Sequence, residues 1–411
     1  MKNIYIFDEY ISSQKNGIGT YLQELLHCFK SSGHSICLII FNADTEEFSI
    51  VEEKETKKLL FPVMKGHFLH HVQVMDKFLR LYIEDDPNNI FFLNHSPCGD
   101  LMESLKKIFP LSKIIFTIHD FGWTAPLMGN LKEYSRLVKN KSFYTNESKK
   151  VKGDFSNCYE EEKRMYGFAD RIICLSPDSY AVLRSVYKLN KKKISFIPNG
   201  LRESSIVSKR KNLEEIRISL NIRNDEKILL VIGRPTKQKG IFVLMKAMKL
   251  ILKTNQNVRL VIIGDANEQS FRELIQAKSS YALSIIFTGL LDKDNIYKWL
   301  SVADIGVIPS YFEQCSFVGI EMMMFGLPIV ASNGIGVRNM FQDNINGLVA
   351  KIGNRNQPRE YVRNLAKAIV RLLDSPDLCN RLSREARKTY EDRYSIHHMK
   401  ENYRALIKSL C

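Results

Sequence analysis

One stretch of the chain decides the fold: Ile305-Gly-Val-Ile-Pro-Ser-Tyr-Phe-Glu-Gln-Cys-Ser-Phe-Val-Gly-Ile-Glu-Met-Met-Met-Phe-Gly-Leu-Pro-Ile-Val-Ala331. Apolar runs at both ends and a helix-period segment between them predict the order strand, loop, helix, strand. Glu313 falls in the loop after the first strand, and Glu321 falls about one turn into the helix. Open α/β sheets bind ligands at the carboxyl ends of their strands, so we expect both carboxylates to reach a ligand crevice.

The start of that helix is a predicted anion site, because the first backbone N–H groups of a helix have no partner within it. The groups in question belong to Cys315, Ser316, Phe317 and Val318. The spacing of the two glutamates carries little weight by itself, since Glu47 and Glu55 share it in a polar stretch that suggests no site. Two surface carboxylates on either side of a helix start are the alternative interpretation.

A second stretch, Ile228 to Leu244, also reads as a strand that ends in glycine, a basic loop and an apolar helix. Gly233 ends the strand, and Arg234 and Lys239 lie five residues apart in the loop. A loop can aim both cations at one diphosphate, since Arg offers a planar fork and Lys a compact charge. Cations that neutralise a leaving diphosphate remove the need for a divalent metal, so we predict no metal site. The alternative is a generally basic half of the protein.

Outward from these stretches, apolar runs alternate with helical segments over the whole chain, which predicts an α/β protein with parallel sheets. The 411 residues suffice for two domains. A polar, charged linker, residues 199–225, predicts a hinge. We therefore expect an N-terminal domain over residues 1–202, a C-terminal domain over 203–385 and a helical segment over 386–411. Apolar side chains at helical spacing mark the last part of the chain: Tyr390, Tyr394, Met399, Tyr403 and Leu406.

The predicted strands fall into two series. In the first half they are 3–7, 35–41, 90–94, 113–119, 171–176 and 193–198, and in the second half 227–233, 258–264, 284–287, 305–309 and 328–331. Two segments break the rhythm. Residues 45–58 are charged, and residues 131–154 are a potential flap over an active site or a plain solvated insertion.

The N-terminal half offers two weaker signals. Asn16-Gly-Ile-Gly19 follows the first strand, where Gly17 and Gly19 allow backbone amides to approach a phosphate and open a helix. A simple tight turn explains this short motif equally well. His119 ends a predicted strand at the sheet edge where ligands bind, or it caps the next segment.

Composition narrows the class of protein. The net charge is +15, with 27 basic and 24 acidic residues up to residue 200 and the excess beyond it. This charge indicates an anionic ligand or surface, and we exclude nucleic acid because no binding motif accompanies it. The start of the chain lacks a basic leader, apolar runs are short, and eight cysteines are scattered singly, so a cytoplasmic protein with reduced thiols is expected.

The combined pattern resembles the large retaining glycosyltransferase family of GT-B fold known as family 4, or glycosyl transferases group 1. The resemblance covers nearly the whole chain. It rests on the Glu313 to Glu321 signature and on several shorter motifs, namely Gly233-Arg234 with Lys239-Gly240, Phe287-Thr-Gly289, Ala303-Asp304 before Pro309-Ser310, Ala169-Asp170 with Ser176, Ile197-Pro-Asn-Gly200 and Asn346-Gly-Leu-Val349.

The resemblance implies two facing Rossmann-like domains, with a C-terminal helix that crosses back to the first. It also assigns roles: Glu313 contacts the transferred sugar, Glu321 binds the ribose, and Arg234 and Lys239 hold the diphosphate. The loop of Gly17 and Gly19 lies beneath the phosphates, and His119 lies near the anomeric carbon. One position departs from the family: Asn339 stands where many relatives have a glutamate, which weakens any inference about the donor.

We therefore expect a cytoplasmic enzyme that moves a hexose or N-acetylhexosamine from a nucleotide sugar to a hydroxyl group, with retention. It takes no cofactor, and we favour a UDP-sugar over a GDP-sugar as donor. The acceptor stays open between a lipid-linked molecule, a saccharide and a peptide, as does peripheral association with the inner face of a membrane. Two alternatives also remain: a non-catalytic partner subunit of the same fold, and a sugar-nucleotide 2-epimerase.

Overall fold

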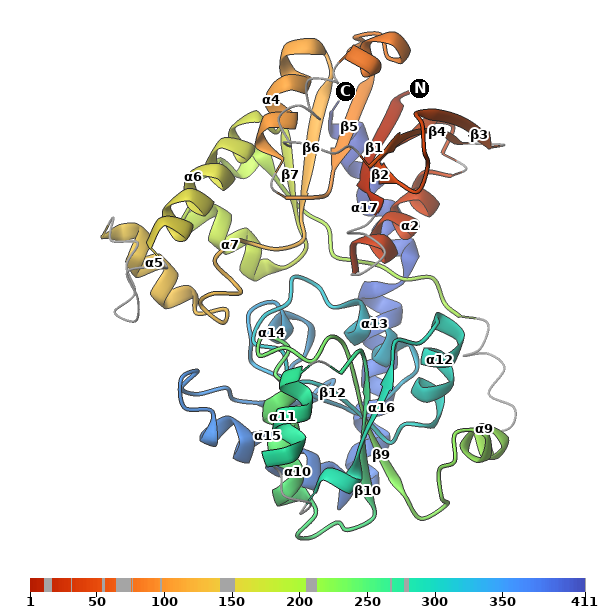
Figure 1. Ribbon diagram of the computed structural model, residues 1–411, viewed down its shortest axis with the longest axis vertical. Coiled ribbons are helices and arrows are strands. Elements are labelled where there is room, and N and C mark those ends of the chain that lie inside the picture. The colour runs from red at the N-terminus through yellow and green to blue at the C-terminus, as the bar shows by residue number, and fades with distance from the viewer. Residues whose placement is uncertain are drawn as a thin grey trace. The chain divides into compact units, whose positions relative to one another are not determined.

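The chain folds into two compact α/β units in the computed structural model (Figure 1). The structure describes residues 1–10, 17–30, 32–53, 56–63, 75, 77–96, 98–140, 152–204, 213–266, 268–276 and 281–410. Unit 1 comprises Met1–Thr124, Asn130–Asn199 and Met399–Cys411, and unit 2 comprises Ala125–Gly129 and Gly200–His398. The boundaries expected from the sequence were residues 202 and 385, and the second differs more from the structure, where unit 2 extends to His398. It lies later because Tyr390 and Tyr394 hydrogen-bond Leu201 of unit 2.

Unit 1 holds an eight-stranded sheet with the order β3-β4-β2-β1-β5-β6-β7-β8, parallel throughout except for the antiparallel pair β3 and β4. The strands are β1 (Asn3–Glu9), β2 (Ser35–Ala43), β3 (Ser49–Glu53), β4 (Thr56–Pro62), β5 (Asn89–Leu93), β6 (Lys113–Ile118), β7 (Arg171–Cys174) and β8 (Ile194–Phe196). Its helices are α2 (Gly17–Phe29), α4 (Gly99–Ile108), α5 (Leu131–Lys139), α6 (Lys152–Phe168), α7 (Pro177–Ser185) and the short turn η1 (Lys191–Lys193).

Unit 2 holds a six-stranded parallel sheet with the order β11-β10-β9-β12-β13-β14. The strands are β9 (Lys227–Ile232), β10 (Val258–Ile263), β11 (Ile285–Gly289), β12 (Ile305–Ile308), β13 (Ile329–Ser332) and β14 (Leu348–Ala350). Around them lie α9 (Leu213–Ser219), α10 (Ile241–Ile251), α11 (Glu268–Gln276), η2 (Ala282–Ser284), α12 (Lys293–Val302), α13 (Phe317–Met324), α14 (Val337–Met340), α15 (Arg359–Leu373) and α16 (Pro376–Thr389).

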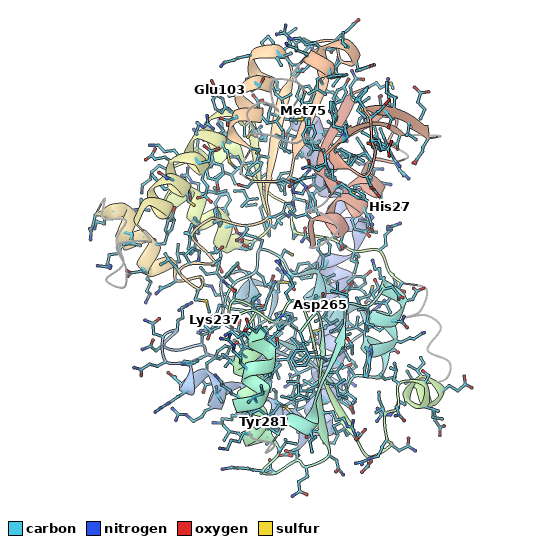
Figure 2. All side chains as sticks on the ribbon, viewed as in Figure 1. His27, Met75, Glu103, Lys237, Asp265 and Tyr281 are labelled. Atoms are coloured by element: carbon cyan, nitrogen blue, oxygen red, sulfur yellow. The ribbon has the colours of Figure 1, made fainter. Side chains whose placement is uncertain are left out.

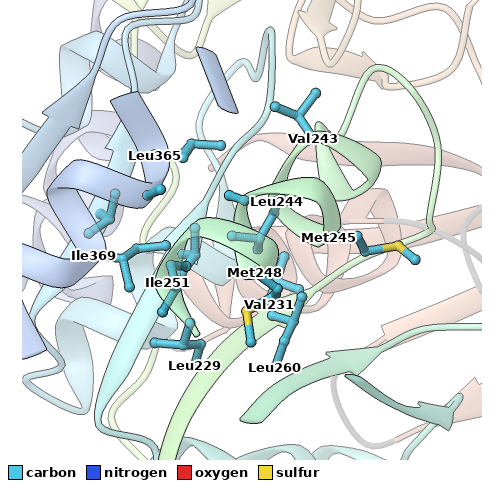
Figure 3. Close-up of a cluster of buried hydrophobic side chains, with 14 of the residues drawn as sticks. Leu229, Val231, Val243, Leu244, Met245, Met248, Ile251, Leu260, Leu365 and Ile369 are labelled. Atoms are coloured by element: carbon cyan, nitrogen blue, oxygen red, sulfur yellow. The ribbon is translucent and has the colours of Figure 1, made fainter. Parts of the chain in front are cut away.

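The core of unit 2 forms because nearly every side chain of β9 and most of those of α10 are apolar. Leu229 and Val231 of β9 meet Leu244 and Met248 of α10, and α15 covers the other side of α10 with Ile369 and its neighbours (Figure 3). Truncating one of these fully buried leucines to alanine costs about 2–5 kcal/mol of unfolding free energy. This core fixes the two strands whose carboxyl ends carry the predicted site.

The C-terminal segment is helical but interrupted. After α16 a π-helical turn η3 (Tyr390–Tyr394) precedes α17 (Ile396–Ser409), because the chain bends where Leu201 pairs with Tyr394 and Ser395. The predicted apolar stripe is confirmed: all five of its side chains are buried. From Met399 on, the helix packs in unit 1, where the Tyr403 hydroxyl hydrogen-bonds that of Tyr21 on α2. The sequence thus correctly predicts a terminal helix that returns to the first domain.

Two predicted irregular segments need comment. Residues 45–58 include β3 and the start of β4, which pair as an antiparallel hairpin at the sheet edge. The sequence predicted a break in the βα pattern there but not these strands. The first part of residues 131–154 is helix α5. The side chain of Asn130 caps the N-terminus of this helix by accepting a hydrogen bond from Glu133 N–H. Residues 141–151 of the predicted flap lie outside the described residues.

Candidate active site

Strand order places the predicted site of unit 2 at a topological switch point. β9 lies between β10 and β12. After β9 the chain continues to β10 on one side, and after β12 it continues to β13 on the other, so the strand order reverses between β9 and β12. Loops that leave two such neighbouring strands diverge and form a crevice at the carboxyl edge, which is where doubly wound sheets bind ligands. The two stretches singled out in the sequence are the loops at this point.

The loop after β9 and the loop after β12 are bonded to each other. Tyr311 N–H donates to Gln238 O at 2.8 Å. Gly240 has φ +67°, and a Cβ there would lie 1.9 Å from the carbonyl oxygen of Pro309. Only glycine permits that conformation and that approach. The neighbouring Lys239 is therefore held against the loop that carries Glu313.

Lys239 and Glu313 form an ion pair. Lys239 Nζ donates to Glu313 Oε1 at 2.7 Å, and Ser310 Oγ donates to the same oxygen at 2.7 Å. The Glu313 side chain is 14% exposed and that of Lys239 is 36% exposed. An ammonium has three N–H donors, so a partly exposed Lys239 can bind a second anion while it keeps this contact. The sequence predicted both residues in one site but not their pairing.

The backbone of Glu313 is also held by Ile335 and Gly336, which precede Asn339 in the sequence. Glu313 N–H donates to Ile335 O at 2.9 Å. Gly336 has φ +72°, and a Cβ there would lie 1.7 Å from Glu313 O. Gly336 therefore has a structural role beside Glu313, and this role does not depend on the replacement of the family's glutamate by Asn339.

Arg234 follows directly after Gly233 on the same loop as Lys239, and its side chain is exposed. Among the residues that the structure describes, its guanidinium has no hydrogen bond or ion pair, so its donors are available. Figure 2 labels Lys237, a further exposed cation of this loop. The N–H of Gly233 is already used, because it donates to Ile263 O at 2.9 Å. Its predicted contact with a ligand therefore cannot use this amide.

Helix α13 begins as predicted, with one correction. Ser316 Oγ caps the helix by accepting from Gly319 N–H at 3.2 Å. The expectation of a free N–H at Ser316 is wrong, because this group donates to Met340 Sδ at 3.3 Å. Cys315 is buried at 6% exposure. The half-buried Phe317 and Val318 have no backbone acceptor among the described residues, so their N–H groups remain for an anion.

Glu321 is buried in α13, with 8% of its surface exposed. Burial raises the pKa of its carboxyl to about 7, while the Lys293 ammonium acts weakly in the opposite direction. A carboxyl group with a pKa of about 7 is partly ionised at neutral pH. Its ionised form accepts hydrogen bonds from hydroxyl groups, so a ligand that donates to it favours ionisation.

The predicted residues of unit 1 lie at the carboxyl edge of its own sheet. His119 directly follows β6. Burial, and to a lesser degree the nearby His95, lowers the pKa of His119 to about 3, so its ring is neutral. Its Nε2 atom is buried without a partner among the described residues, and the ring stands edge-on to Tyr21 at 4.5 Å. Gly17 and Gly19 lie in the first turn of α2, while Asn16 of that motif lies outside the described residues.

A polar group that was not predicted from the sequence lies at the switch point of unit 1, between β1 and β5. His95 Nε2 lies 3.1 Å from Asp8 Oδ1 and 3.2 Å from the amide nitrogen of Glu9. Glu9 Oε1 accepts from Asn42 Nδ2 at 3.1 Å. A signal was present, since Asp8-Glu9 ends one strand and Asn94-His95 follows another. Nothing in the sequence, however, shows that these two strands are neighbours.

The two units with their parallel sheets define a two-domain protein with Rossmann-like domains. The family Glycosyltransferase Family 4 matches residues 15–204, and the family Glycosyl transferases group 1 matches residues 212–389. The chain belongs to the family 4 glycosyltransferases of GT-B fold.

Individual relatives agree. An uncharacterized glycosyltransferase of Methanocaldococcus jannaschii is 24% identical over 358 residues, which cover 85% of this chain and 84% of the relative. Sucrose-phosphate synthase from Thermosynechococcus elongatus has the same fold, with a TM-score of 0.75, 20% identity and coverage of 100% and 99% of the two chains. HepE of Anabaena, solved in complex with UDP-glucose, superposes with a TM-score of 0.70 at 14% identity, and each chain is covered completely.

Two features are absent from the part of the chain that the structure describes. No helix in the described ranges is both long and apolar enough to cross a membrane. No three His, Cys, Asp or Glu side chains in those ranges are grouped to hold a metal ion. The metal-independent reaction stays a prediction.

Proposed function

We propose that this glycosyltransferase moves a hexose or N-acetylhexosamine from a UDP-sugar to an acceptor hydroxyl, with retention and without a metal. The observation that carries the proposal is the ion pair between Lys239 and Glu313 at the switch point, with the exposed Arg234 on the same loop as Lys239. The choice of UDP over GDP takes support from HepE, whose structure contains UDP-glucose.

The donor fits the site in three parts. Its diphosphate meets Arg234, the free donors of Lys239 and the N–H groups at the start of α13, all of which favour anions. Its ribose hydroxyls donate to the Glu321 carboxylate. Its sugar lies against Glu313, which Ser310 and Lys239 hold in one orientation.

The chemistry follows from the same groups. As the glycosidic bond breaks, negative charge grows on the β-phosphate, and Arg234, Lys239 and the helix amides stabilise it. The acceptor hydroxyl attacks from the face that the phosphate leaves and gives its proton to a phosphate oxygen, so configuration is retained. Glu313 keeps the sugar in position during this exchange.

Unit 1 is proposed to serve the acceptor side. Neutral His119 offers a hydrogen bond to a sugar hydroxyl near the reacting carbon, and the first turn of α2 with Gly17 and Gly19 lies beneath the phosphates. The acceptor is a lipid-linked molecule, a saccharide or a peptide. A lipid-linked acceptor goes with peripheral association at the inner face of a membrane.

The test begins with a thermal-shift screen of UDP-, GDP-, ADP- and dTDP-sugars, since a bound donor raises apparent stability by mass action. The donor that binds is then used to measure release of nucleoside diphosphate. We expect Arg234→Ala to lower the rate about 100-fold or more. Arg363→Ala, an equal change at an exposed position on α15, should leave it unchanged.

The outcomes separate the alternatives. A non-catalytic subunit binds donor without releasing nucleoside diphosphate, and an epimerase that keeps the nucleotide attached changes the sugar without releasing it. An Arg234→Ala enzyme with wild-type activity would remove the diphosphate assignment.

A further inference from the structure

Unit 1 has a basic pocket on the edge of its sheet opposite to the switch point. The pocket lies where the chain enters β7 and β8, beside the end of α6, and has a volume of about 480 Å³. Its lining residues are Lys106, Gly167, Phe168, Ala169, Asp170, Arg171, Asn190, Lys192 and Lys193. This volume lies within the range of about 300–1,000 Å³ typical of small-molecule sites.

The charge of the lining is strongly one-sided. Four cations face one carboxylate, Asp170, which is already engaged: it accepts from Lys106 Nζ at 2.6 Å and from Ile114 N–H at 2.7 Å. The neighbouring acid on α4, Glu103 (Figure 2), is taken up by Lys107 at 2.8 Å and by Arg164 at 3.4 Å. Residues 1–200 are close to balanced, with 27 basic against 24 acidic side chains, so the surplus is local.

The three other cations have only neutral partners or none. Arg171 donates to the carbonyl oxygen of Lys192, and Lys193 Nζ donates to Gly167 O at 3.0 Å, at the end of α6. Among the described residues, no ion pair involves Arg171, Lys192 or Lys193. A guanidinium has five N–H donors and an ammonium three, so most of the donors in the pocket remain available.

The charged form of Lys193 is disfavoured by its surroundings, and a bound anion would favour it. Burial lowers its pKa, the Asp170 carboxylate opposes this, and the Lys106 ammonium lowers the pKa further. A bound anion would favour the charged form of Lys193 again.

We propose that this pocket binds a soluble phosphate monoester of sugar-phosphate size, separately from the donor. A phosphoryl group has three terminal oxygens and close to two negative charges. It therefore matches one arginine fork and two lysines better than a singly charged carboxylate does. The apolar side of the lining, Phe168 and Ala169, and the amide of Asn190 adjoin the non-phosphate part of the ligand.

The experiment is calorimetric titration of glucose 6-phosphate and inorganic phosphate into the full chain saturated with UDP, which keeps phosphate out of the donor site. We expect binding of glucose 6-phosphate, weaker binding of inorganic phosphate, and none of glucose. Arg171→Gln with Lys192→Gln should weaken binding at least tenfold, since both substitutions remove charge-assisted hydrogen bonds to the phosphoryl group. Lys30→Gln with Lys139→Gln changes the charge of unit 1 equally at exposed positions and should have no effect.

Further results separate this proposal from the others. Arg234→Ala should bind glucose 6-phosphate like the wild type, because the proposed sites are different. Titration without heat for either phosphate compound, or equal binding by the pocket variant, overturns the proposal and leaves Lys193 as a cap for the end of α6. Sedimentation with phosphatidylglycerol vesicles that depends on Arg171 and Lys192, without binding of glucose 6-phosphate, overturns it in favour of a lipid headgroup.

Discussion

The two units have the same strand arrangement at their switch points but opposite chemistry there. In unit 2, the loop after β9 carries three cations, Arg234, Lys237 and Lys239, and the loop after β12 carries one partly buried carboxylate, Glu313. In unit 1, the edge formed by β1, β5 and β6 carries the carboxylates Asp8 and Glu9.

The imidazoles of unit 1 complete the contrast. His119 is neutral, and its buried Nε2 has no partner among the described residues. Cations suit a diphosphate, whereas carboxylates and neutral rings suit hydroxyl groups. We therefore propose that one topology supplies both a place for an anionic donor, in unit 2, and a place for a hydroxyl-bearing acceptor, in unit 1. The loop residues determine which.

The largest effect is expected from the carboxylate of unit 2. Glu313→Gln keeps the shape but loses the charge that pairs with Lys239, so the sugar is no longer held in the reacting position. We expect transfer to fall by about 100- to 1,000-fold with little change in donor affinity. Steady-state kinetics measure this. Glu268→Gln, at an exposed position of the same unit, is the control, and wild-type turnover by Glu313→Gln would refute the role.

A backbone change should disturb the same loop without touching its charges. At Gly336 a Cβ would lie 1.7 Å from Glu313 O in a left-handed conformation, so Gly336→Ala must displace the loop. We expect a loss of about 3 kcal/mol in unfolding free energy together with reduced transfer. Denaturant unfolding measures it. Gly167→Ala, where no atom stands within 4 Å of the added Cβ, should cost far less; equal losses would show that the close approach is unimportant.

A smaller effect tests the loop after His119 in unit 1. Glu162 accepts from Gly122 N–H at 2.7 Å and from the Tyr187 hydroxyl, and burial raises its pKa from 4.5 to about 7. The folded chain then binds this proton more tightly than the unfolded chain does. The contribution to stability is complete below about pH 4.5 and is lost as the pH rises through about 7.

Glu162→Gln keeps the shape and removes this titration. The loss of unfolding free energy between about pH 5 and pH 7.5 should shrink by about 2 kcal/mol relative to wild type. Urea unfolding at the two pH values measures it, with exposed Glu160→Gln on the same helix as control. An unchanged pH dependence would mean that Glu162 is ionised in the folded chain.

The sequence predicted the βα order, nearly all parallel strands and the two glutamates of α13 and its preceding loop, because apolar runs and the loops after them are local features. It missed the β3–β4 hairpin. In that hairpin Lys58 pairs with Glu53 across an exposed edge, and a charged stretch without an apolar face reads as a loop.

Contacts between distant positions could not be predicted. The use of the Ser316 amide by Met340 and the place of Glu162 between Gly122 and Tyr187 depend on packing, which no spacing along the chain shows. The same holds for Asp8 and His95, which are neighbours only because β1 and β5 are adjacent strands.

The most direct test compares the binding of UDP and uridine by calorimetry, in wild type and in Arg234→Ala with Lys239→Ala. The two ligands differ only in the diphosphate, so the ratio of their affinities reports the contacts of that group. We predict a strong preference of wild type for UDP and a loss of most of it, about 100-fold, in the double variant, with uridine affinity unchanged. A preference for UDP that survives both substitutions would contradict diphosphate binding by the loop after β9.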